Sequence, residues 1–327
     1  MSVLVTGGAG YIGSVTVDAL LAAGESVAVL DDLSNGHREA VDPRVPFYES
    51  DTEDGETLAG IVKRHGIKQL VHFASFISVS ESVQTPLRYF DNNLGKMVKM
   101  LSVLQSCGVE NVVFSSTAAV YGEPEYVPID EDHPQKPLNP YGLSKYFAEQ
   151  VLDWVDAAYG MSHVALRYFN ASGATAAKGE AHRPESHLIP LALQVPLGKR
   201  ARLAVYGDDY PTPDGTCVRD YIHVADLADA HVKALAYLRE GGASQKINLG
   251  NGKGFSVREI VTAAEKVTAA AIPFRVEPRR EGDPAILIAS SEKARKILGW
   301  TPRYPELEDI IRSAWEWHKT HPSGYST

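Results

Sequence analysis

The amino-acid sequence predicts an α/β protein: a doubly wound parallel sheet with helices on both faces, and a smaller C-terminal α/β lobe. Short apolar, β-branched runs alternate with amphipathic stretches of helical period through the first half of the chain. This alternation ends at about residue 170, where polar segments rich in Gly and Pro begin. The chain has 327 residues, about two to three times the length of a typical single domain. Together these observations favour two lobes, of which the first is the more regular.

The first lobe is expected to contain a strand at each short apolar run. These runs are residues 2–6, 26–30, 45–48, 69–73, 112–115 and 163–168. Helices are expected between them, at residues 13–23, 58–65, 96–106 and 144–159. Continuous apolar runs are typical of strands buried on both faces, and the separations suit right-handed crossovers between parallel strands.

The second lobe is expected to consist of several excursions of the chain rather than a second regular sheet. Residues 174–186 are polar and predict a loop or lid, and residues 206–217 are irregular because they contain several Gly and Pro residues. Further strands and helices are expected at residues 202–205, 226–238, 247–249, 257–267 and 292–298. We therefore predict domains at residues 1–170 and 171–327, and segments after residue 220 can return to the first domain.

Composition and charge exclude several classes of protein. The chain has 32 Lys and Arg against 41 Asp and Glu, and this net charge of −9 argues against non-specific binding to nucleic acids or anionic membranes. No apolar stretch approaches the roughly 18 residues of a membrane span, and no signal peptide is expected before the first strand. Cys107 and Cys217 form no CxxC pair, which favours free thiols in a reducing cytoplasm. Neither the two cysteines nor the 11 histidines show a metal-ligand spacing, so no metal site is expected.

A glycine-rich turn follows the first strand and opens the first helix. Gly7, Gly10 and Gly13 allow a tight turn in which the backbone approaches a pyrophosphate, at a helix N-terminus that favours anions. Asp31, at the end of the second strand, is suited to accept both hydroxyls of an adenosine ribose and to repel a 2′-phosphate. The combination predicts a Rossmann-type site for NAD rather than NADP. Two loop residues can assist or merely be solvated: Asp32 and Asn35.

Tyr141 and Lys145 lie four residues apart at the start of a predicted helix, and so on one helix face. A phenol with a pKa of about 10 is a poor base at neutral pH, but an adjacent ammonium and a positive nicotinamide ring both favour the phenolate. Thr117 ends the fifth strand, at the carboxyl edge where such sheets bind ligands, and can hydrogen-bond the oxygen that Tyr141 deprotonates. These residues predict proton transfer beside a dinucleotide.

The glycine turn, Thr117 and the Tyr141–Lys145 pair resemble the extended short-chain dehydrogenase/reductases. Longer stretches narrow this resemblance to the UDP-glucose 4-epimerase family, and they are residues 72–74, 81–83, 91–93, 118–122, 167–170, 218–224 and 279–283. The resemblance spans essentially the whole chain. It implies a reversible interconversion of UDP-galactose and UDP-glucose with bound NAD, catalysed by Tyr141, Lys145 and Thr117. It also implies a homodimer formed by helices near residues 93–106 and 145–158.

The resemblance implies a larger set of cofactor contacts. Tyr11 and Ile12 are expected at the pyrophosphate, and Asp51 and Thr52 at the adenine edge. The remaining implied cofactor residues are Phe73, Ala74, Ser75, Asn92, Ser115, Tyr141, Lys145, Tyr168 and Phe169. Ile77 stands where some relatives have a Lys, which predicts weaker retention of NAD.

On the substrate side, the resemblance implies residues from both lobes. They are Thr117, Tyr141, Asn170, His187, Leu188, Ala204, Tyr206, Arg219, Arg280, Asp283 and Leu287. Two arginines facing a diphosphate agree with the bidentate binding of phosphate by guanidinium groups. His187 replaces an Asn of some relatives, and either side chain can donate to an oxygen. Leu287 is expected to limit the C2 substituent of the sugar and so to favour glucose and galactose over N-acetylated sugars.

Three other functions are compared with the same residues. A 4,6-dehydratase needs an acid and a base after the hydroxyl residue, whereas Ala118 and Ala119 follow Thr117 here. Epimerases acting on UDP-N-acetylhexosamines or UDP-pentoses share every catalytic residue, so this alternative stays open. A non-catalytic NAD-binding protein would be expected to lack Tyr141 or Lys145, and both are present.

Overall fold

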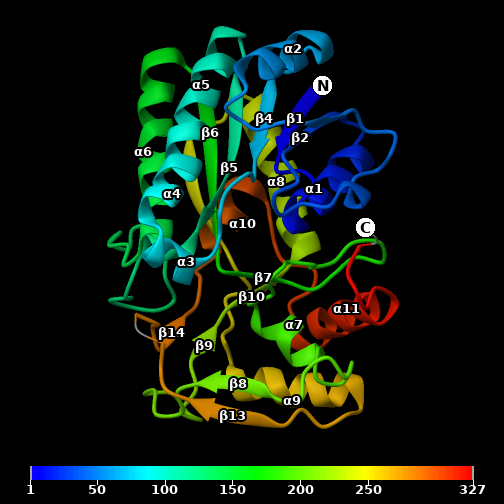
Figure 1. Ribbon diagram of the computed structural model, residues 1–327. Coiled ribbons are helices and arrows are strands. Elements are labelled where there is room, and N and C mark those ends of the chain that lie inside the picture. The colour runs from blue at the N-terminus through cyan, green and yellow to red at the C-terminus, as the bar shows by residue number, and fades with distance from the viewer. Residues whose placement is uncertain (1, 281, 326–327) are drawn as a thin grey trace.

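Seven parallel strands form the main sheet within residues 2–280 and 282–325, which the computed structural model describes (Figure 1). Their order across the sheet is β11, β6, β5, β4, β1, β2, β3. Their bounds are β1 Ser2–Thr6, β2 Ser26–Asp31, β3 Phe47–Glu49, β4 Gln69–His72, β5 Asn111–Thr117, β6 Ser162–Tyr168 and β11 Gln245–Leu249. This is the Rossmann-type order, which confirms the predicted fold class. The order reverses between β1 and β4, so their carboxyl ends flank the point at which such sheets bind ligands.

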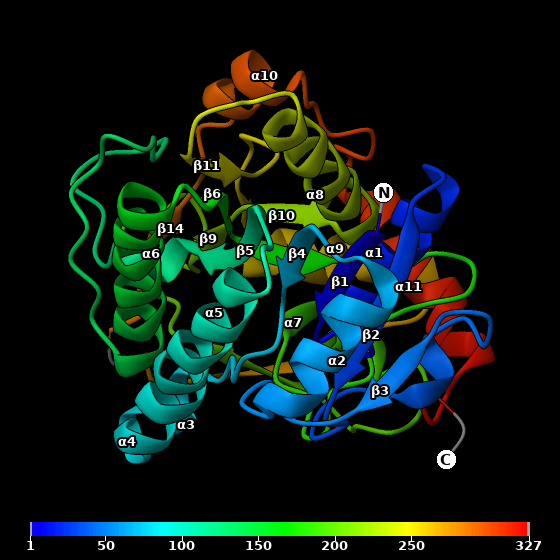
Figure 2. The same cartoon turned by 90° about the horizontal axis from the view of Figure 1, so that it is seen from above.

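Helices cover both faces of this sheet, as Figure 2 shows from above. One face is covered by α2 (Gly55–His65), α5 (Lys96–Ser106) and α6 (Pro140–Tyr159), and the other by α1 (Tyr11–Ala22), α8 (Val224–Arg239) and α10 (Glu292–Leu298). The two-residue period of a strand explains the division, because Val3 and Val5 of β1 pack into the α1 and α8 layer while Leu4 packs into the α2 and α5 layer.

Short helices between β4 and α5 were not predicted. These are α3 (Val79–Gln84), whose N-cap Ser78 accepts a hydrogen bond from the Glu81 amide, and α4 (Pro86–Phe90), which has Pro86 in its first turn. A π-helical turn, Asp91–Gly95, joins α4 to α5. Each element has five or six residues, which is too short for a helical period to stand out in the sequence.

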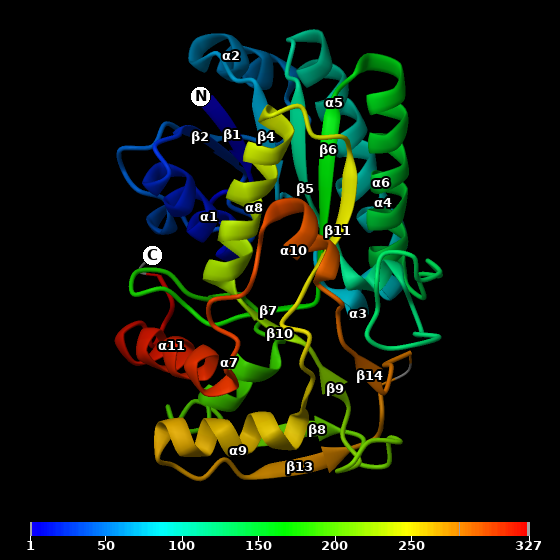
Figure 3. The same cartoon turned by 180° about the vertical axis from the view of Figure 1, so that it is seen from behind.

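The second lobe lies below the sheet in Figures 1 and 3. Its helices are α7 (Leu188–Leu193), α9 (Val257–Thr268) and α11 (Leu307–Thr320), and their apolar faces share one core with β8 (Leu203–Tyr206). β8 pairs in parallel with β13 (Phe274–Glu277), while β9 (Val218–Arg219) lies between β12 (Phe255–Ser256) and β14 (Ile286–Leu287). β7 (Asn170–Ser172) pairs with β10 (Tyr221–His223) where the chain passes between the lobes.

Several element bounds differ from those expected. The third strand is Phe47–Glu49 instead of residues 45–48, and the fifth extends over Asn111–Thr117 instead of residues 112–115. α11 was not expected at all, although its buried residues follow a helical period. α8 packs on the main sheet and β11 pairs with β6, so this part of the chain adds to the first sheet. Among the described helices, none is both long and apolar enough to cross a membrane.

Candidate active site

The glycine turn lies at the carboxyl end of β1 and is packed so tightly that side chains are excluded. Gly7 has φ +74°, and a Cβ atom there would lie 2.5 Å from the Ala74 amide nitrogen. A Cβ atom on Gly13 would lie 2.1 Å from the Gly7 carbonyl oxygen. Only glycine fits these two positions, and this brings the first turn of α1 directly onto the loop.

Asp31 lies beside this turn, at the carboxyl end of β2, and is buried. Its carboxylate accepts hydrogen bonds from the Ala9 amide and the Leu33 amide, both at 2.9 Å. Burial raises the pKa of Asp31, and the two amides partly oppose that shift. Each carboxylate oxygen keeps a free lone pair, so Asp31 can still accept from two ribose hydroxyls.

The other loop residues expected near the cofactor are less constrained. Asp32 and Asn35 are exposed, and Asp32 accepts hydrogen bonds from Ser34 in its own turn. Asp51 forms an ion pair with Lys96 of α5. The glycine turn and Asp31 together fit a dinucleotide. Any side chain at the glycine positions would fill the turn, and the turn adjoins a buried carboxylate with free lone pairs.

The segment after β4 closes over the glycine turn. The Phe73 and Ala74 amides both donate to the Thr6 carbonyl of β1, at 2.8 and 3.2 Å. The buried Asn93 organises this region, and Asn92, the residue expected at the cofactor, donates to the Asn93 side-chain oxygen at 3.1 Å. Asn93 accepts from the Phe76 amide at 2.8 Å and donates to the Ser144 hydroxyl of α6 at 3.2 Å. The adjacent-asparagine motif was visible in the sequence, but which asparagine faces inward depends on the π-helical turn.

Tyr141 and Thr117 meet because α6 begins against the end of β5. Asn139 caps α6 by accepting from the Gly142 amide at 2.9 Å, and Pro140 occupies its first turn. A Cβ atom on Gly142 would lie 2.5 Å from the Ala119 carbonyl oxygen, so glycine is required for this approach. The Thr117 and Tyr141 side chains are hydrogen-bonded in this arrangement.

Lys145 is buried one turn further along α6. Its Nζ donates to the Ser75 hydroxyl and to the Ser115 carbonyl, both at 2.9 Å, so it connects the ends of β4 and β5. Burial lowers the pKa of Lys145 to about 7. Burial also raises the pKa of Tyr141, and Thr117 is the residue whose hydrogen bond lowers it. The ammonium–phenolate pairing expected from the sequence therefore has to overcome the desolvation of both groups.

A buried ion pair behind Lys145 was missed by the sequence reasoning. Glu149, one further turn along α6, accepts from Arg167 of β6 at 2.9 and 2.5 Å and from the Ser116 hydroxyl at 2.5 Å. Both charged side chains are fully buried. The Glu149 carboxylate raises the pKa of Lys145 against the effect of burial. The row Tyr141, Lys145, Glu149 at spacing four is a signal that could have revealed this partner.

Two aromatic residues flank the same edge. Tyr168 is buried at the end of β6, and its hydroxyl is hydrogen-bonded to the Ser115 hydroxyl. Phe169 packs with Leu287 against a small cluster after β5 that contains Ala118 and Val120. Leu287 therefore packs against a cluster that includes residues of the loop that begins at Thr117.

Some of the residues expected at the substrate lie on or near β9 and β14. Arg219 is paired with Asp283 and stands opposite Leu287 in the strand register. The Arg280 guanidinium lies 3.9 Å from the centre of the Tyr206 ring. Glu281 of the same sequence motif lies outside the described residues.

Other expected substrate residues lie on neighbouring elements. Ala204 and Tyr206 share one face of β8, since Leu203 and Val205 point into the core. Asn170 donates to the Asp220 carbonyl at 3.0 Å.

Asp220, which the sequence reasoning did not assign, fixes the corner after Arg219. Its buried carboxylate accepts from the amides of Asn251, Gly252 and Ala289 at 2.8, 3.0 and 3.1 Å. Burial raises the pKa of Asp220 to about 7 despite these hydrogen bonds. The residue has a positioning role, because it holds the strand on which Arg219 lies.

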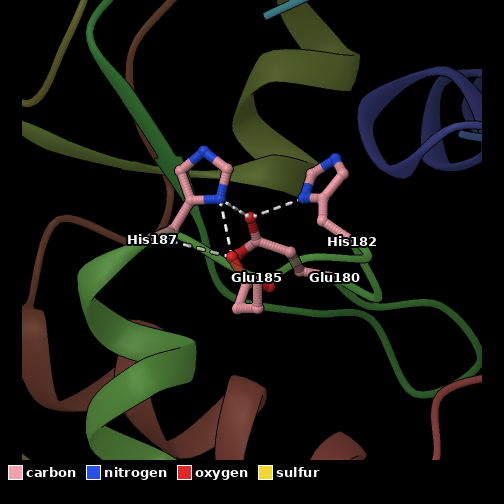
Figure 4. A group of neighbouring side chains, drawn as sticks. All are labelled: Glu180, His182, Glu185 and His187. Carbon is pink, nitrogen blue, oxygen red and sulfur yellow. Dashed lines mark hydrogen bonds and ion pairs between the residues drawn. The ribbon is translucent and has the colours of Figure 1, made fainter. Parts of the chain in front are cut away.

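His187, the last expected substrate residue, directly precedes Leu188 at the start of α7 and belongs to a cluster with Glu180, His182 and Glu185 (Figure 4). Its Nδ1 lies 2.6 Å from a Glu180 carboxylate oxygen and 2.9 Å from a Glu185 oxygen. The two carboxylates raise the pKa of His187, and the two histidines lower that of Glu180. This cluster falls in the segment expected to be a loop, and its spacing of alternating acidic residues and histidines went unnoticed.

The chain is similar over its whole length to proteins of known family. A sequence model of the "NAD dependent epimerase/dehydratase family" matches residues 3–250. The UDP-glucose 4-epimerase of Lacticaseibacillus casei is 55% identical over 327 residues, which cover 99% of each chain.

Two solved structures extend this similarity to the fold. A UDP-glucose 4-epimerase from Brucella ovis, in complex with NAD, has 45% identity and a TM-score of 0.93 over 96% of this chain and 97% of that one. A UDP-glucose 4-epimerase from Bifidobacterium longum, in complex with NAD⁺ and UDP, has 38% identity and a TM-score of 0.94 over 99% and 100% of the two chains.

Proposed function

The chain belongs to the NAD dependent epimerase/dehydratase family, and we propose that it is an NAD-dependent enzyme that interconverts UDP-galactose and UDP-glucose. One observation carries this assignment: a chain that is similar end to end to UDP-glucose 4-epimerases assembles Thr117, Tyr141 and Lys145 at the carboxyl edge beside the glycine turn. The reaction is an inversion at C4 of the hexose and leaves no net redox change.

Tyr141 acts as the base of the reaction. Its phenolate oxygen takes the proton of the sugar 4-hydroxyl, and the hydrogen bond from Thr117 supports the charge that this step requires. Bound NAD would supply the acceptor and then the donor of the C4 hydride, so that the 4-keto sugar is reduced on its other face. Tyr141 then gives its proton back to the oxygen, so protons and electrons balance over one turnover.

Lys145 and Asp31 hold the cofactor at its two ends. Lys145 is anchored by Ser75 and the Ser115 carbonyl. In this proposal its ammonium binds the nicotinamide ribose and, together with the cofactor's positive ring, favours the phenolate of Tyr141. Asp31 accepts from the adenosine ribose. The remaining cofactor contacts proposed from the resemblance lie in the segments that follow β1, β3, β4 and β6, and they include Tyr11, Asp51, Phe73 and Phe169.

The site must bind the diphosphate of the substrate tightly and its hexose loosely. Arg219 and Arg280 supply the positive charge that an acidic chain must place locally in order to bind a nucleotide diphosphate. The hexose has to present both faces of C4 in turn, so it must be held loosely. Leu287, packed beside Ala118 and Phe169, limits the room at C2 of the sugar in this proposal.

We also propose a cytoplasmic homodimer. Apolar side chains are exposed on neighbouring helices: Val83, Leu87, Val98, Phe147 and Trp154, with Leu87 82% and Trp154 77% exposed. α3 and α4 pack against α6, so these side chains belong to one region of the surface. A second copy of the chain is the occupant that the predicted dimer helices support. The cytoplasmic location rests on the two cysteines, both of which are free.

The direct test is to incubate the purified protein with NAD⁺ and UDP-galactose, and separately with UDP-N-acetylgalactosamine, and to follow C4 epimers by NMR. We expect rapid formation of UDP-glucose and slow conversion of the N-acetylated sugar. Conversion of neither sugar would contradict the proposed substrate class.

The Tyr141→Phe variant identifies the base in the same assay. Removing the phenol oxygen should lower kcat by about 10²- to 10⁴-fold, because the step loses general-base catalysis. Binding of NAD and UDP should persist, as measured by fluorescence titration. Unchanged turnover would contradict the role of Tyr141 while leaving the substrate assignment intact.

A further inference from the structure

Four potential metal ligands converge within one short segment, residues 180–187. The ligand atoms of Glu180, His182, Glu185 and His187 all lie within 4.8 Å of one another (Figure 4). The Nδ1 atoms of both histidines face the same Glu180 oxygen, at 3.1 Å from His182 and 2.6 Å from His187. A Glu185 oxygen completes the group, 2.9 Å from His187 Nδ1. Two nitrogens and two oxygens thus lie close enough together to share one ion.

Among the described residues, the carboxylates of Glu180 and Glu185 form no ion pair with a Lys or Arg side chain. The Glu180 and Glu185 side chains are only 4% and 9% exposed, and within the described residues they form ion pairs with His182 and His187 alone. Carboxylates withdrawn from water require a compensating charge. One divalent cation bound to two carboxylates and two neutral imidazoles gives a neutral group, so its charge matches this donor set.

We propose that Glu180, His182, Glu185 and His187 form a binding site for a divalent metal ion, with Zn²⁺ as the preferred ion. Imidazole nitrogens and carboxylate oxygens are established Zn²⁺ ligands, and four donors satisfy a closed tetrahedral site. The donors of such a site lie about 3.4 Å apart, given metal–ligand lengths of about 2.1 Å. The present separations of the ligand atoms, from 2.6 Å up to 4.8 Å, lie on both sides of this spacing. Mg²⁺ and Ca²⁺ are disfavoured because they prefer sites made of oxygen alone.

The surroundings of the cluster orient the ligands. One Glu185 oxygen accepts from the backbone amides of Ser186 and His187 at 2.7 and 2.8 Å, which holds that carboxylate in place. The His182 ring meets the Tyr11 ring edge-on at a centroid distance of 6.2 Å. Such outer contacts hold ligand side chains in position.

An ion can reach the cluster from solvent. A pocket of about 170 Å³ borders it, lined by Glu180, His182 and Glu185 together with Lys199 and His318. A bound ion would join four points of the segment that precedes α7, and through His182 it would support Tyr11 in the glycine turn. The inference goes beyond the proposed function and does not depend on it, since metal binding is measured without substrate.

The test uses the full chain with NAD, freed of metal by a chelator. Zn²⁺ is titrated by calorimetry, and Co²⁺ by visible absorption. We expect one ion per chain and the visible bands of four-coordinate Co²⁺, without the near-ultraviolet bands of thiolate ligands. His182→Gln and Glu180→Gln should each weaken Zn²⁺ binding by more than the roughly 10- to 100-fold that loss of an outer contact typically costs. His65→Gln, a histidine substitution on α2 beside Tyr48, is the matched control and should bind as the parent does.

Two results of the binding titrations would overturn the proposal. One is Zn²⁺ binding of equal affinity in the parent and in His182→Gln, and the other is the absence of stoichiometric binding. Thiolate bands in the Co²⁺ spectrum would likewise assign the ion to the cysteines and contradict the site. If the buried Glu180→Gln variant does not fold, the partly exposed His182→Gln variant still decides the question.

Discussion

Lys145 shows at the scale of one residue how burial and chemistry oppose each other. Its ammonium is needed beside Tyr141, yet burial lowers its pKa to about 7, compared with about 10.4 in an unfolded chain. The unfolded chain therefore binds more protons between about pH 7 and pH 10, and the stability linked to Lys145 rises with pH through that window. Below about pH 7 both states are protonated, and the folded protein carries the full cost of the buried charge.

Lys145→Met should consequently stabilise the NAD-free protein at low pH. The pKa difference corresponds to roughly 5 kcal/mol, from which the two lost hydrogen bonds subtract, so we expect a gain on the order of 2 kcal/mol at pH 6. The gain should vanish near pH 10, as measured by urea unfolding at both values. Lys63→Met on the exposed side of α2 is the control. A gain that does not change with pH would mean that Lys145 keeps an ordinary pKa.

Leu287 is the residue at which sugar preference can be tested. It packs against the cluster that contains Ala118 and Val120, so shortening it opens space next to the loop that begins at Thr117. Leu287→Ala should raise the ratio of kcat/KM for UDP-N-acetylgalactosamine over UDP-galactose by about 10- to 100-fold, the range that pocket size alone supplies. Ile286→Ala, the neighbouring half-buried position of β14, should leave the ratio unchanged. An unchanged ratio in both variants would remove Leu287 from the specificity site.

At the scale of elements, the junction of β1 and α1 requires glycine because the backbone of the loop leaves no room for a side chain. A glycine in the middle of another helix, α2, is not crowded in this way. A Cβ atom at Gly13 would lie 2.1 Å from the Gly7 carbonyl oxygen, whereas one at Gly60 of α2 meets nothing within 4 Å. Gly13→Ala should therefore destabilise the fold by about 1–3 kcal/mol and abolish NAD binding, because the loop and helix must separate. Gly60→Ala should stabilise it by roughly 0.5–1 kcal/mol through helix propensity alone.

Denaturant unfolding and NAD titration of both variants check this expectation. Equal stability changes in the two variants would show that the close approach at Gly13 has no energetic consequence. Retained NAD affinity in Gly13→Ala would separate the glycine turn from cofactor binding.

At the scale of the whole molecule, exposed apolar side chains on α6 predict assembly. Phe147 and Trp154 lie two helical turns apart and so on one face, 40% and 77% exposed. Trp154→Glu should convert the proposed dimer to a monomer, because a carboxylate cannot be buried there without a partner. Light scattering after size-exclusion chromatography measures the mass. Val276→Glu on β13, in the second lobe, is the control. A monomeric parent protein would contradict the dimer.

The sequence alone determined the parts of this protein whose signals are local. The alternation of apolar runs and helical periods predicted the Rossmann-type sheet, because strands buried on both faces must be apolar throughout. The glycine turn with Asp31, and Tyr141 with Lys145 on one helix face, are likewise local patterns, and the structure places them at adjacent strand ends.

Only the tertiary structure decided which distant residues meet. Glu149 pairs with Arg167 across two elements, Asn93 is turned inward by a π-helical turn, and Asp220 collects amides from two separate loops. The metal-ligand cluster at residues 180–187 is local in sequence, but a loop has no regular period that aligns its side chains. The sequence therefore does not show that these four side chains face one another, and only the folded structure does. Hydrophobic periodicity predicts which faces of helices and strands are buried. It does not predict which buried polar side chains contact one another, because those contacts depend on how distant elements pack.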